Sequence, residues 1–289
     1  MQIVSYSARR IYDASNEYIG EAMSDVLSET GISGHLRYKD AFSIYMLDSV
    51  TSTNTVLREK AVNGASEGCV IVADEQTAGK GRLGRTFYSA AKHGAYFSLL
   101  LRPAYDSRDA VLITPAAAVA ATRAIKDVFG VKAGIKWVND LLVSGRKVCG
   151  ILTEASFNSE SGAIESAILG VGINITAPES GYPEEIAGTA GAITGMQSVG
   201  NNERCALIAA VLDYFWEYYQ DLPERSFLED YRALSVVTGK DIFVMSSGEK
   251  KPARALHIDD DCGLVVRYEG GDVATLRSGE VSVRVRGEE

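Results

Sequence analysis

The apolar residues of this chain recur at regular spacings, so its strands and helices can be predicted before any chemistry is considered. Short continuous or alternating apolar runs predict strands, whereas apolar positions three and four apart predict amphipathic helices. Outside the C-terminal region, the predicted strands are 42–47, 69–74, 96–101, 134–143, 148–157 and 163–175. The predicted helices are 53–63, 114–129, 207–218 and 227–234. Turn residues separate the last three strands, as an antiparallel meander requires.

Residues with special backbone preferences support two of these helix boundaries. Pro115 suits a first helical turn because its missing N–H needs no partner there, and Gly130 is placed to end the same helix. Near the N-terminus, the apolar residues of 19–27 share one helical face. We expect a short helix there, with Gly31 as its C-cap.

Beyond about residue 237 the pattern changes to short strands with polar breaks between them. These strands are 242–245, 253–258, 264–268, 273–276 and 281–285. Strands that follow one another at such short intervals are typical of a small β-barrel. The chain is therefore expected to have an α+β fold, in which a mixed, mostly antiparallel sheet with helices precedes an all-β module.

Composition and charge narrow the possible partners. The chain has 289 residues, of which 46% are hydrophobic and 23% charged, as in ordinary soluble globular proteins. Its formal net charge of −9 argues against broad contact with a nucleic-acid backbone, which calls for a basic face.

The cysteines and histidines are too scattered to form a recognisable metal or catalytic motif. The cysteines are Cys69, Cys149, Cys205 and Cys262, and the histidines are His35, His93 and His257. The cysteines are expected to be buried free thiols in a reducing compartment. The N-terminus does not resemble a signal peptide, and no apolar run approaches the ~20 residues of a membrane span. We therefore expect a cytoplasmic protein without a membrane partner.

The segment from Gln76 to Arg85 is rich in both glycine and cations. Glycine lets backbone N–H groups approach a ligand closely, and Lys and Arg supply positive charge. No Asp or Glu occurs between Gln76 and Tyr105, although the whole chain is acidic. The segment therefore predicts a site for a small anion such as a nucleotide phosphate.

Three of these glycines, Gly79, Gly81 and Gly84, also have the spacing of a dinucleotide-binding fingerprint. That motif requires a helix that opens at the third glycine. Here the following residues show no helical period and lead into the strand 96–101. A Walker motif is excluded as well, because Lys80 is not followed by Ser or Thr at the required spacing. The segment is therefore expected to be an anion-binding loop of another kind, and the alternative is a solvated basic loop whose glycines form turns.

Four segments, taken in order, resemble the motifs of the biotin protein ligase family. They are 52–54, 75–85, 136–140 with its continuation to 154, and 170–174. Residues 278–284 resemble the end of the family's SH3-like C-terminal module, so the resemblance covers residues 40–286. Each motif is weak alone, but their joint order and spacing are specific.

The resemblance implies an architecture. The catalytic domain would be an α+β domain like that of class II aminoacyl-tRNA synthetases, over residues 41–235, followed by an SH3-like β-barrel over 236–289. Residues 1–40 would be an extension with one short helix. Some family members carry an N-terminal winged helix and act as repressors. The short extension and the acidic charge lead us to expect a monofunctional ligase that binds no nucleic acid.

The resemblance also implies an activity, the ATP-dependent attachment of biotin to a lysine of a biotin carboxyl carrier protein. Biotin carboxylate first attacks the α-phosphate of ATP to form biotinyl-5′-AMP, and the carrier lysine then displaces AMP. Biotin is a substrate, ATP and Mg²⁺ are co-substrates, and no cofactor is permanently bound. The chemistry needs positioned anions and neutralised charge rather than a nucleophilic side chain. A homodimer formed through the sheet is left open.

Biotin-binding residues follow from the same resemblance. They are Ser52, Thr53, Asn54, Gln76, Gly79, Lys80, Gly81, Arg82, Tyr96, Lys147, Gly150 and Ile151. Neutral polar groups such as Ser52, Thr53 and Gln76 suit the ureido ring, which offers one acceptor and two donors. Each segment also has a plain structural reading, since residues 52–54 can cap a helix and residues 150–151 can simply pack within a strand.

The ATP-binding residues implied are Arg82, Arg85, Phe87, Lys136, Asn139, Asp140 and Asn174. Catalytic roles fall to Arg82, Lys147 and Asp140. Lys147 would lie between the biotin carboxylate and the α-phosphate, although its place after a turn also suits a surface lysine. Asp140 is a candidate to assist deprotonation of the carrier lysine. No metal ligand is assigned, and Phe87 can equally be a core residue.

Two departures from the family pattern concern geometry rather than charge. Lys80 stands where many members have arginine, which removes bidentate bonding, and Val138 stands where many have proline. Two other functions remain as alternatives. Lipoate or octanoyl ligases and transferases share the general fold class, and a non-catalytic sensor would lack a key cation.

Overall fold

The computed structural model describes residues 26–105, 109–158, 162–246, 249–277 and 281–285. Among these residues, seven strands form a larger sheet in the spatial order β1-β2-β3-β7-β6-β5-β4. Strands β1 and β2 are parallel, and the other neighbouring pairs are antiparallel. The strands are β1 Ser43–Val50, β2 Cys69–Gln76, β3 Gly94–Leu101, β4 Gly134–Lys136, β5 Asp140–Val143, β6 Arg146–Phe157 and β7 Ile164–Asn174.

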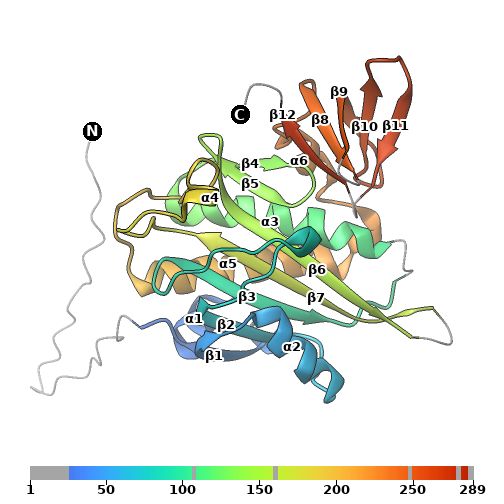
Figure 1. Ribbon diagram of the computed structural model, residues 1–289. Helices are drawn as coiled ribbons and strands as arrows, with labels where there is room; N and C mark the ends of the chain where they lie inside the picture. The colour runs from blue at the N-terminus through green and yellow to red at the C-terminus, as the bar shows by residue number, and fades with distance from the viewer. Residues whose placement is uncertain (1–25, 106–108, 159–161, 247–248, 278–280, 286–289) are drawn as a thin grey trace, which may run out of the picture.

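Helices lie on both faces of this sheet. The long helices α3 and α5 cover one face and pack against each other, and α2 lies on the opposite face as the crossover between the parallel strands β1 and β2 (Figure 1). The α-helices are α1 Glu29–His35, α2 Thr53–Val62, α3 Ile113–Phe129, α4 Glu184–Ala187, α5 Asn201–Gln220 and α6 Leu228–Ala233. Short 3₁₀ turns are η1 Lys39–Ala41, η2 Arg82–Gly84, η3 Asp109–Leu112 and η4 Leu222–Glu224.

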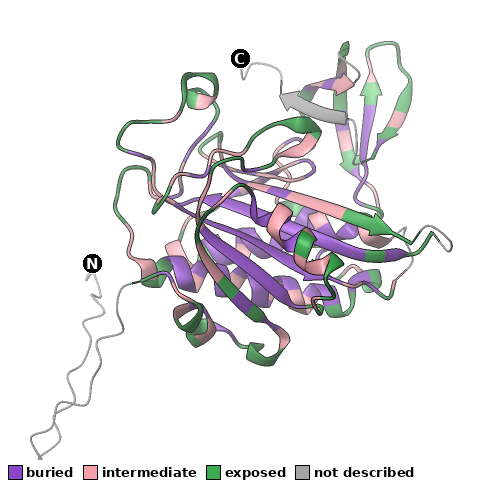
Figure 2. Ribbon diagram, turned by 60° about the horizontal axis from the view of Figure 1, so that its bottom comes forward, coloured by how far each residue is buried: buried purple, intermediate pink, exposed green. Residues whose placement is uncertain are grey.

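The central strands are buried on both sides, which explains their continuous apolar runs. In β2, Val70 and Val72 belong to the core shared with α3 and α5. The intervening Ile71 packs instead with Leu57 of α2. Figure 2 shows the same contrast between the buried strands of this sheet and the exposed loops around it. The two-sided burial fixes which residues face each layer, because successive side chains alternate across a strand.

A second, smaller sheet follows, with five antiparallel strands among the described residues, in the order β11-β10-β9-β8-β12. The strands are β8 Asp241–Ser246, β9 Glu249–Ile258, β10 Leu264–Tyr268, β11 Val273–Leu276 and β12 Val281–Val285. All five correspond to strands expected from the sequence.

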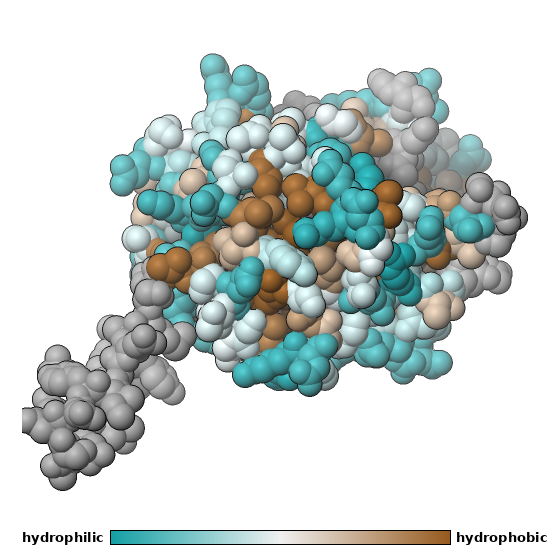
Figure 3. Space-filling model, turned by 90° about the horizontal axis from the view of Figure 1, so that it is seen from below, coloured by the Kyte–Doolittle hydropathy of each residue, from teal (hydrophilic) through white to brown (hydrophobic). Residues whose placement is uncertain are grey.

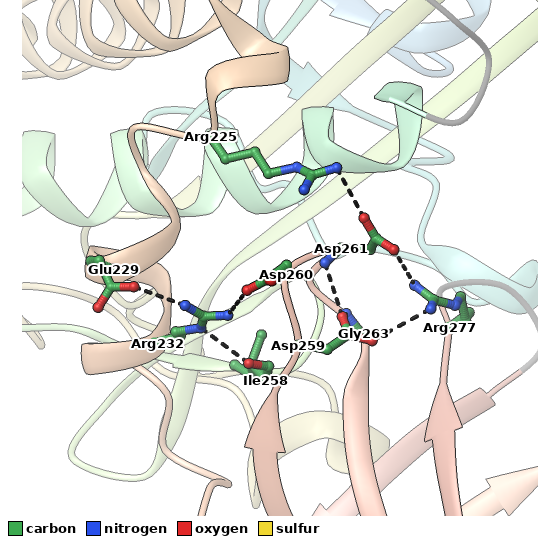
Figure 4. A network of polar contacts seen from close by, with 9 residues as sticks. All are labelled: Arg225, Glu229, Arg232, Ile258, Asp259, Asp260, Asp261, Gly263 and Arg277. Carbon is green, nitrogen blue, oxygen red and sulfur yellow. Dashed lines mark hydrogen bonds and ion pairs between the residues drawn. The ribbon is translucent and has the colours of Figure 1, made fainter.

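The turn between β9 and β10 is acidic and is held by arginines (Figure 4). Arg225 contacts Asp261 at 3.0 Å, and Arg232 of α6 contacts Asp260 at 2.6 Å and the Ile258 carbonyl at 3.1 Å. These side chains are partly exposed, so each ion pair is weak alone. Together they attach the small sheet to the segment around α6.

The expected meander is confirmed, because β5, β6 and β7 follow one another as antiparallel neighbours. Gly130 ends α3 in the left-handed conformation, with φ of 68°, as expected of a C-cap. The single strand expected over 134–143 is wrong. A tight turn at Trp137–Asn139 divides it into β4 and β5, because buried hydrogen bonds from other elements hold that turn.

The helix near the N-terminus also differs from the expectation. It begins after Ser28, whose Oγ accepts a hydrogen bond from the Gly31 N–H at 3.1 Å, and extends to His35. Gly31 therefore lies inside the first turn and is not a C-cap. An added Cβ there would lie 2.9 Å from Cys205 Sγ, so glycine permits close packing of α1 on α5. The residues before 26 in the expected helix lie outside the described residues.

Two further expectations concern the cysteines and the absence of a membrane span. All four cysteines are free and buried, as expected. No helix in the described part of the chain is long and apolar enough to cross a membrane.

Seen from below, apolar side chains gather near the middle of the molecule, with polar ones around them (Figure 3).

Candidate active site

A row of paired residues crosses five strands of the larger sheet. Tyr96 pairs with Gly172, Gly172 with Gly150, Gly150 with Asp140, and Asp140 with Lys136. Residues directly opposite one another in neighbouring strands point to the same face. Two of the motif segments, 136–154 and 170–174, therefore meet with Tyr96 on one face of the sheet, which we call the site face.

The site face is the one opposite α3 and α5. Ile151, the neighbour of Gly150 in β6, is 1% exposed and packs in the core on the helix-covered face. Its backbone N–H donates to the Asn139 carbonyl at 3.1 Å, and its carbonyl accepts from Asn139 Nδ2 at 2.8 Å. Any part that Ile151 plays in binding would thus come from its backbone, which fixes Asn139.

The first turn of α2 lies at one end of the site face. Ser52 is its N-cap residue, and Ser52, Thr53 and Asn54 are all almost fully buried. The Thr53 N–H donates to Gln76 Oε1 at 2.9 Å, and the Thr53 hydroxyl lies 3.1 Å from the same oxygen. Gln76 Nε2 in turn donates to Ser89 Oγ at 2.9 Å. The structure therefore brings residues 52–54 and Gln76 together as the resemblance implies.

The loop between β2 and β3 carries the cation-rich segment. Its ends are tied together, because the Phe87 N–H donates to the Gly79 carbonyl at 2.9 Å and the Gly81 N–H to the Arg85 carbonyl at 2.7 Å. A Cβ on Gly79 would lie 2.5 Å from the Phe87 carbonyl oxygen, so only glycine fits this crossing. The loop leads into a strand and not a helix, which agrees with rejection of the dinucleotide motif.

The side chain of Phe87 folds from this loop onto the site face. A Cβ on Gly172 would lie 2.6 Å from Phe87 Cε1, and one on Gly150 would lie 3.1 Å from Phe87 Cδ2. The ring therefore rests on the paired glycines and has an edge-on contact with Tyr96, 6.5 Å between centroids. Two opposed glycines leave a flat depression in the sheet that accepts a ring.

Three charged groups lie near this part of the sheet. Lys147 Nζ lies 2.6 Å from Asp140 Oδ1, and both side chains are about one-third exposed or less, at 35% and 28%. Arg82 Nη1 donates to Asn139 Oδ1 at 3.2 Å. Burial lowers the pKa of Arg82, although the nearby Asp140 carboxylate opposes that shift. A partly desolvated guanidinium is well suited to binding an anion, which restores the interactions lost with water.

The backbone around Lys147 is held by a segment that the sequence did not indicate. The Lys147 N–H donates to the Thr189 carbonyl, and its carbonyl accepts from the Gly191 N–H, both at 2.8 Å. Asn174 Nδ2 and the Tyr182 hydroxyl donate to the Gly191 carbonyl, at 3.2 and 2.9 Å. Residues 189–191 thus join Lys147 and Asn174, which lie far apart in the sequence.

The turn at Trp137–Asn139 is anchored from outside the large sheet. Trp137 Nε1 donates to the Cys262 carbonyl, in the turn between β9 and β10, at 2.9 Å, and the Tyr231 hydroxyl of α6 donates to the Val138 carbonyl at 3.0 Å. Both bonds are buried, so they fix the segment that carries Lys136, Asn139 and Asp140. Trp137 is thus a core residue.

Two of the remaining candidates, Lys80 and Arg85, are exposed on the loop between β2 and β3, beside the site face. Sequence reasoning missed Ser98 and Glu154, which bond to residues 53–54. A polar residue within the apolar run 95–101 was the available signal for Ser98. No group of three or more His, Cys, Asp or Glu side chains in the described ranges could hold a metal ion.

Comparison with known proteins agrees with this geometry. Residues 46–174 match the model of the biotin/lipoate A/B protein ligase family. The bifunctional ligase/repressor BirA of Bacillus subtilis is 33% identical over 243 residues, which span 82% of this chain and 70% of that protein. The chain belongs to the biotin/lipoate A/B protein ligase family.

Two other members of the family are also similar to this chain, one in sequence and one in structure. A biotin–[acetyl-CoA-carboxylase] ligase of Mycobacterium tuberculosis is 29% identical over 237 residues, 80% of this chain and 85% of its own length. A biotin protein ligase from Aquifex aeolicus, solved in complex with biotin and ATP, superposes with a TM-score of 0.68 at 26% identity. That match covers 84% of this chain and 99% of the solved one. The fold of this chain is therefore that of the family's biotin protein ligases.

Proposed function

We propose that the chain is a biotin protein ligase, which uses ATP to attach biotin to a lysine of the biotin carboxyl carrier protein of a carboxylase, through biotinyl-5′-AMP. The observation that carries this proposal is the site face itself. Lys147 and Asp140 form an ion pair beside Gly150, and Arg82 bonds to the neighbouring Asn139, so the three residues to which the resemblance assigns catalytic roles lie close together. The M. tuberculosis relative is named for the same activity.

The first step joins two anions, the biotin carboxylate and the α-phosphate, so it needs cations between them. We propose that Lys147 lies between these groups and that Arg82 and Arg85 bind phosphate oxygens. Lys147 is already paired with Asp140, which would hold its ammonium group over the depression until the anions arrive. No protein nucleophile is required, because the attacking and leaving oxygens belong to the substrates.

The second step needs a neutral amine on the carrier lysine. We propose that Asp140 accepts a proton from the incoming ammonium group once Lys147 has turned towards the substrate anions. Its 28% exposed side chain is accessible to such a group. The loop that carries Arg82 and Phe87 would cover the adenylate and exclude water, which would otherwise hydrolyse the mixed anhydride.

Biotin would bind by its ureido ring near Ser52, Thr53 and Gln76, with Lys80 and the glycines of the loop beside it. The rest of biotin would lie over the paired glycines, in place of the Phe87 ring that rests there in the structure. Lys136, Asn139 and Asn174 would bind ATP. Mg²⁺ keeps several waters and is held largely by phosphates, so the carboxylate of Asp140 fits a metal that arrives with ATP.

We also propose the domain boundaries, the location and the partners of the protein from its composition and architecture. Residues 41–235 would be the catalytic domain, and 236–289 an SH3-like module built from the small antiparallel sheet. Free buried cysteines suit a cytoplasmic location. The net charge of −9 favours a protein carrier over nucleic acid as partner, and a homodimer would form through an edge strand of the large sheet.

The decisive experiment is incubation of the protein with ATP, Mg²⁺ and either biotin or octanoate, with release of pyrophosphate as the readout. We expect release with biotin only. Octanoate is included because the family also contains lipoate ligases. Turnover with octanoate but not biotin would overturn the proposal.

A further inference from the structure

The side chain of Asn54 already has partners on both ends of its amide. Its Nδ2 donates to Glu154 Oε2 at 2.8 Å, and its Oδ1 accepts from Ser98 Oγ at 2.6 Å. Asn54 is 4% exposed and Ser98 is completely buried. These bonds cross from α2 to β3 and β6, so they join three elements of the fold.

Proton accounting fixes the direction of these bonds. Asn54 Oδ1 can only accept, so it takes the single hydroxyl proton of Ser98. Ser98 Oγ also lies 2.7 Å from Thr53 Oγ1, and that contact must then use the proton of Thr53. Gln76 Oε1 keeps the backbone N–H of Thr53 at 2.9 Å in either case. The pattern is therefore satisfied without any ligand.

The side-chain amide of Asn54 is also in close van der Waals contact with the sheet. A Cβ on Gly170 would clash directly with Asn54 Oδ1, so β7 approaches the amide closely and glycine alone permits it. One helical turn later, Arg58 forms an ion pair with the other oxygen of Glu154. Two successive turns of α2 are thus attached to the β6 carboxylate, and no room is left for a ligand between Asn54 and the sheet.

We propose that Asn54 is a positioning residue and not a direct biotin ligand, and that Ser98 and Glu154 act with it to fix the first turn of α2. This inference rests on the proposed function and changes one residue assignment within it. Thr53 and Gln76 would be the groups that contact biotin, and their placement depends on α2 being held at this height above β3 and β6.

The same bonds extend to the cation-rich loop. Gln76 Nε2 donates to Ser89 Oγ at 2.9 Å, and the Ser89 hydroxyl donates to the Phe87 carbonyl at 3.2 Å. A shift of Thr53 would therefore move Gln76 and, through Ser89, the part of the loop that carries Phe87. Loss of Ser98 or Glu154 should weaken biotin binding although neither side chain would touch biotin.

The test compares Asn54→Ala, Ser98→Ala and Glu154→Ala in the biotin-dependent release of pyrophosphate. Each should raise the KM for biotin about tenfold, the scale of one lost buried hydrogen bond, with kcat at saturating biotin little changed. The double variant Asn54→Ala/Ser98→Ala should resemble either single variant, because both act through one helix position. Glu154→Gln should restore much of the affinity, since its amide oxygen still accepts from Asn54 Nδ2.

Thr122→Ala is the matched control. Thr122 is 5% exposed and its hydroxyl donates to the Ala118 carbonyl within α3, on the other face of the sheet. It should leave the KM for biotin unchanged. The substitutions at the buried Asn54 and Ser98 could prevent folding. Glu154 is 27% exposed, so its variants leave the core packed and still test the inference.

Three results would overturn the inference. The first is a raised KM in Asn54→Ala alone, with Ser98→Ala and Glu154→Ala like wild type, which would indicate direct contact. The second is a multiplicative effect in the double variant, and the third is an unchanged KM in all three. Failure of the proposed function looks different, since the wild-type protein would then release no pyrophosphate with biotin.

Discussion

Trp137→Phe should destabilise the protein by removing the bond between its two sheets. The indole Nε1 donates to the Cys262 carbonyl at 2.9 Å, and both residues are 4% exposed. Phenylalanine retains most of the ring contact but has no donor. The Cys262 carbonyl would then be buried without this partner, in a turn that is otherwise held by ion pairs of modest strength from Arg225 and from Arg232 of α6.

The expected loss of unfolding free energy is about 1–3 kcal/mol for the unsatisfied carbonyl, with about 1 kcal/mol more for the smaller ring. A cavity of ≈ 50 Å³ lies beside the bond, lined in part by Val138 and Cys262. A space larger than about 10–15 Å³ can admit a water molecule, which would satisfy the carbonyl and bring the loss towards the lower end of this range.

Urea unfolding followed by far-ultraviolet circular dichroism is the suitable assay, because the variant removes one of two tryptophans and so alters fluorescence. Tyr231→Phe should give a similar loss, since that hydroxyl donates to the neighbouring Val138 carbonyl. Trp216→Phe is the control, because Trp216 makes ring contacts with Phe42 and Tyr219. If Trp137→Phe were as stable as Trp216→Phe and wild type, the bond would not join the sheets as we argue.

Three other outcomes are expected. Arg82→Gly should retain the adenylate poorly, so that nearby lysines are labelled without specificity, and undiminished retention would show that the loop is no lid. Asp140→Asn should slow transfer from preformed adenylate to the carrier, and an unimpaired rate would exclude its part in the second step. Burial raises the pKa of Cys262 and of Tyr182 to about 12. The unfolded chain therefore releases protons that the folded one keeps, so stability measured against pH should fall as pH rises from about 9 to 12.

Local sequence rules predicted the elements whose ends they control. Gly130 ends α3, and the helix expected over 53–63 is found as α2 over Thr53–Val62, because capping preferences act within one turn. They could not predict the break at Trp137–Asn139, since the bonds that hold it come from Tyr231 and Cys262, nearly 100 residues or more away. The error in the helix predicted near the N-terminus has a similar cause, because Gly31 allows close contact with Cys205 and does not cap a helix.

Predictions for the site show the same division. Family motifs indicated Gly150 and Gly172 separately, but only strand register reveals that they are opposite each other and form one depression. Ser98 and Glu154 were not assigned roles because each bonds to a side chain that is distant in sequence. Motif reading therefore finds residues that contact small molecules more readily than it finds those that hold them.

The row that joins Tyr96, Gly172, Gly150, Asp140 and Lys136 has a consequence for how the protein acquires activity. Its members come from five strands spread over some 80 residues, so the depression exists only when all four pairings are in register. Non-local pairing of this kind forms slowly. After dilution from denaturant, biotin binding should thus return later than the helical signal in circular dichroism. The time at which binding returns would report when the sheet is complete.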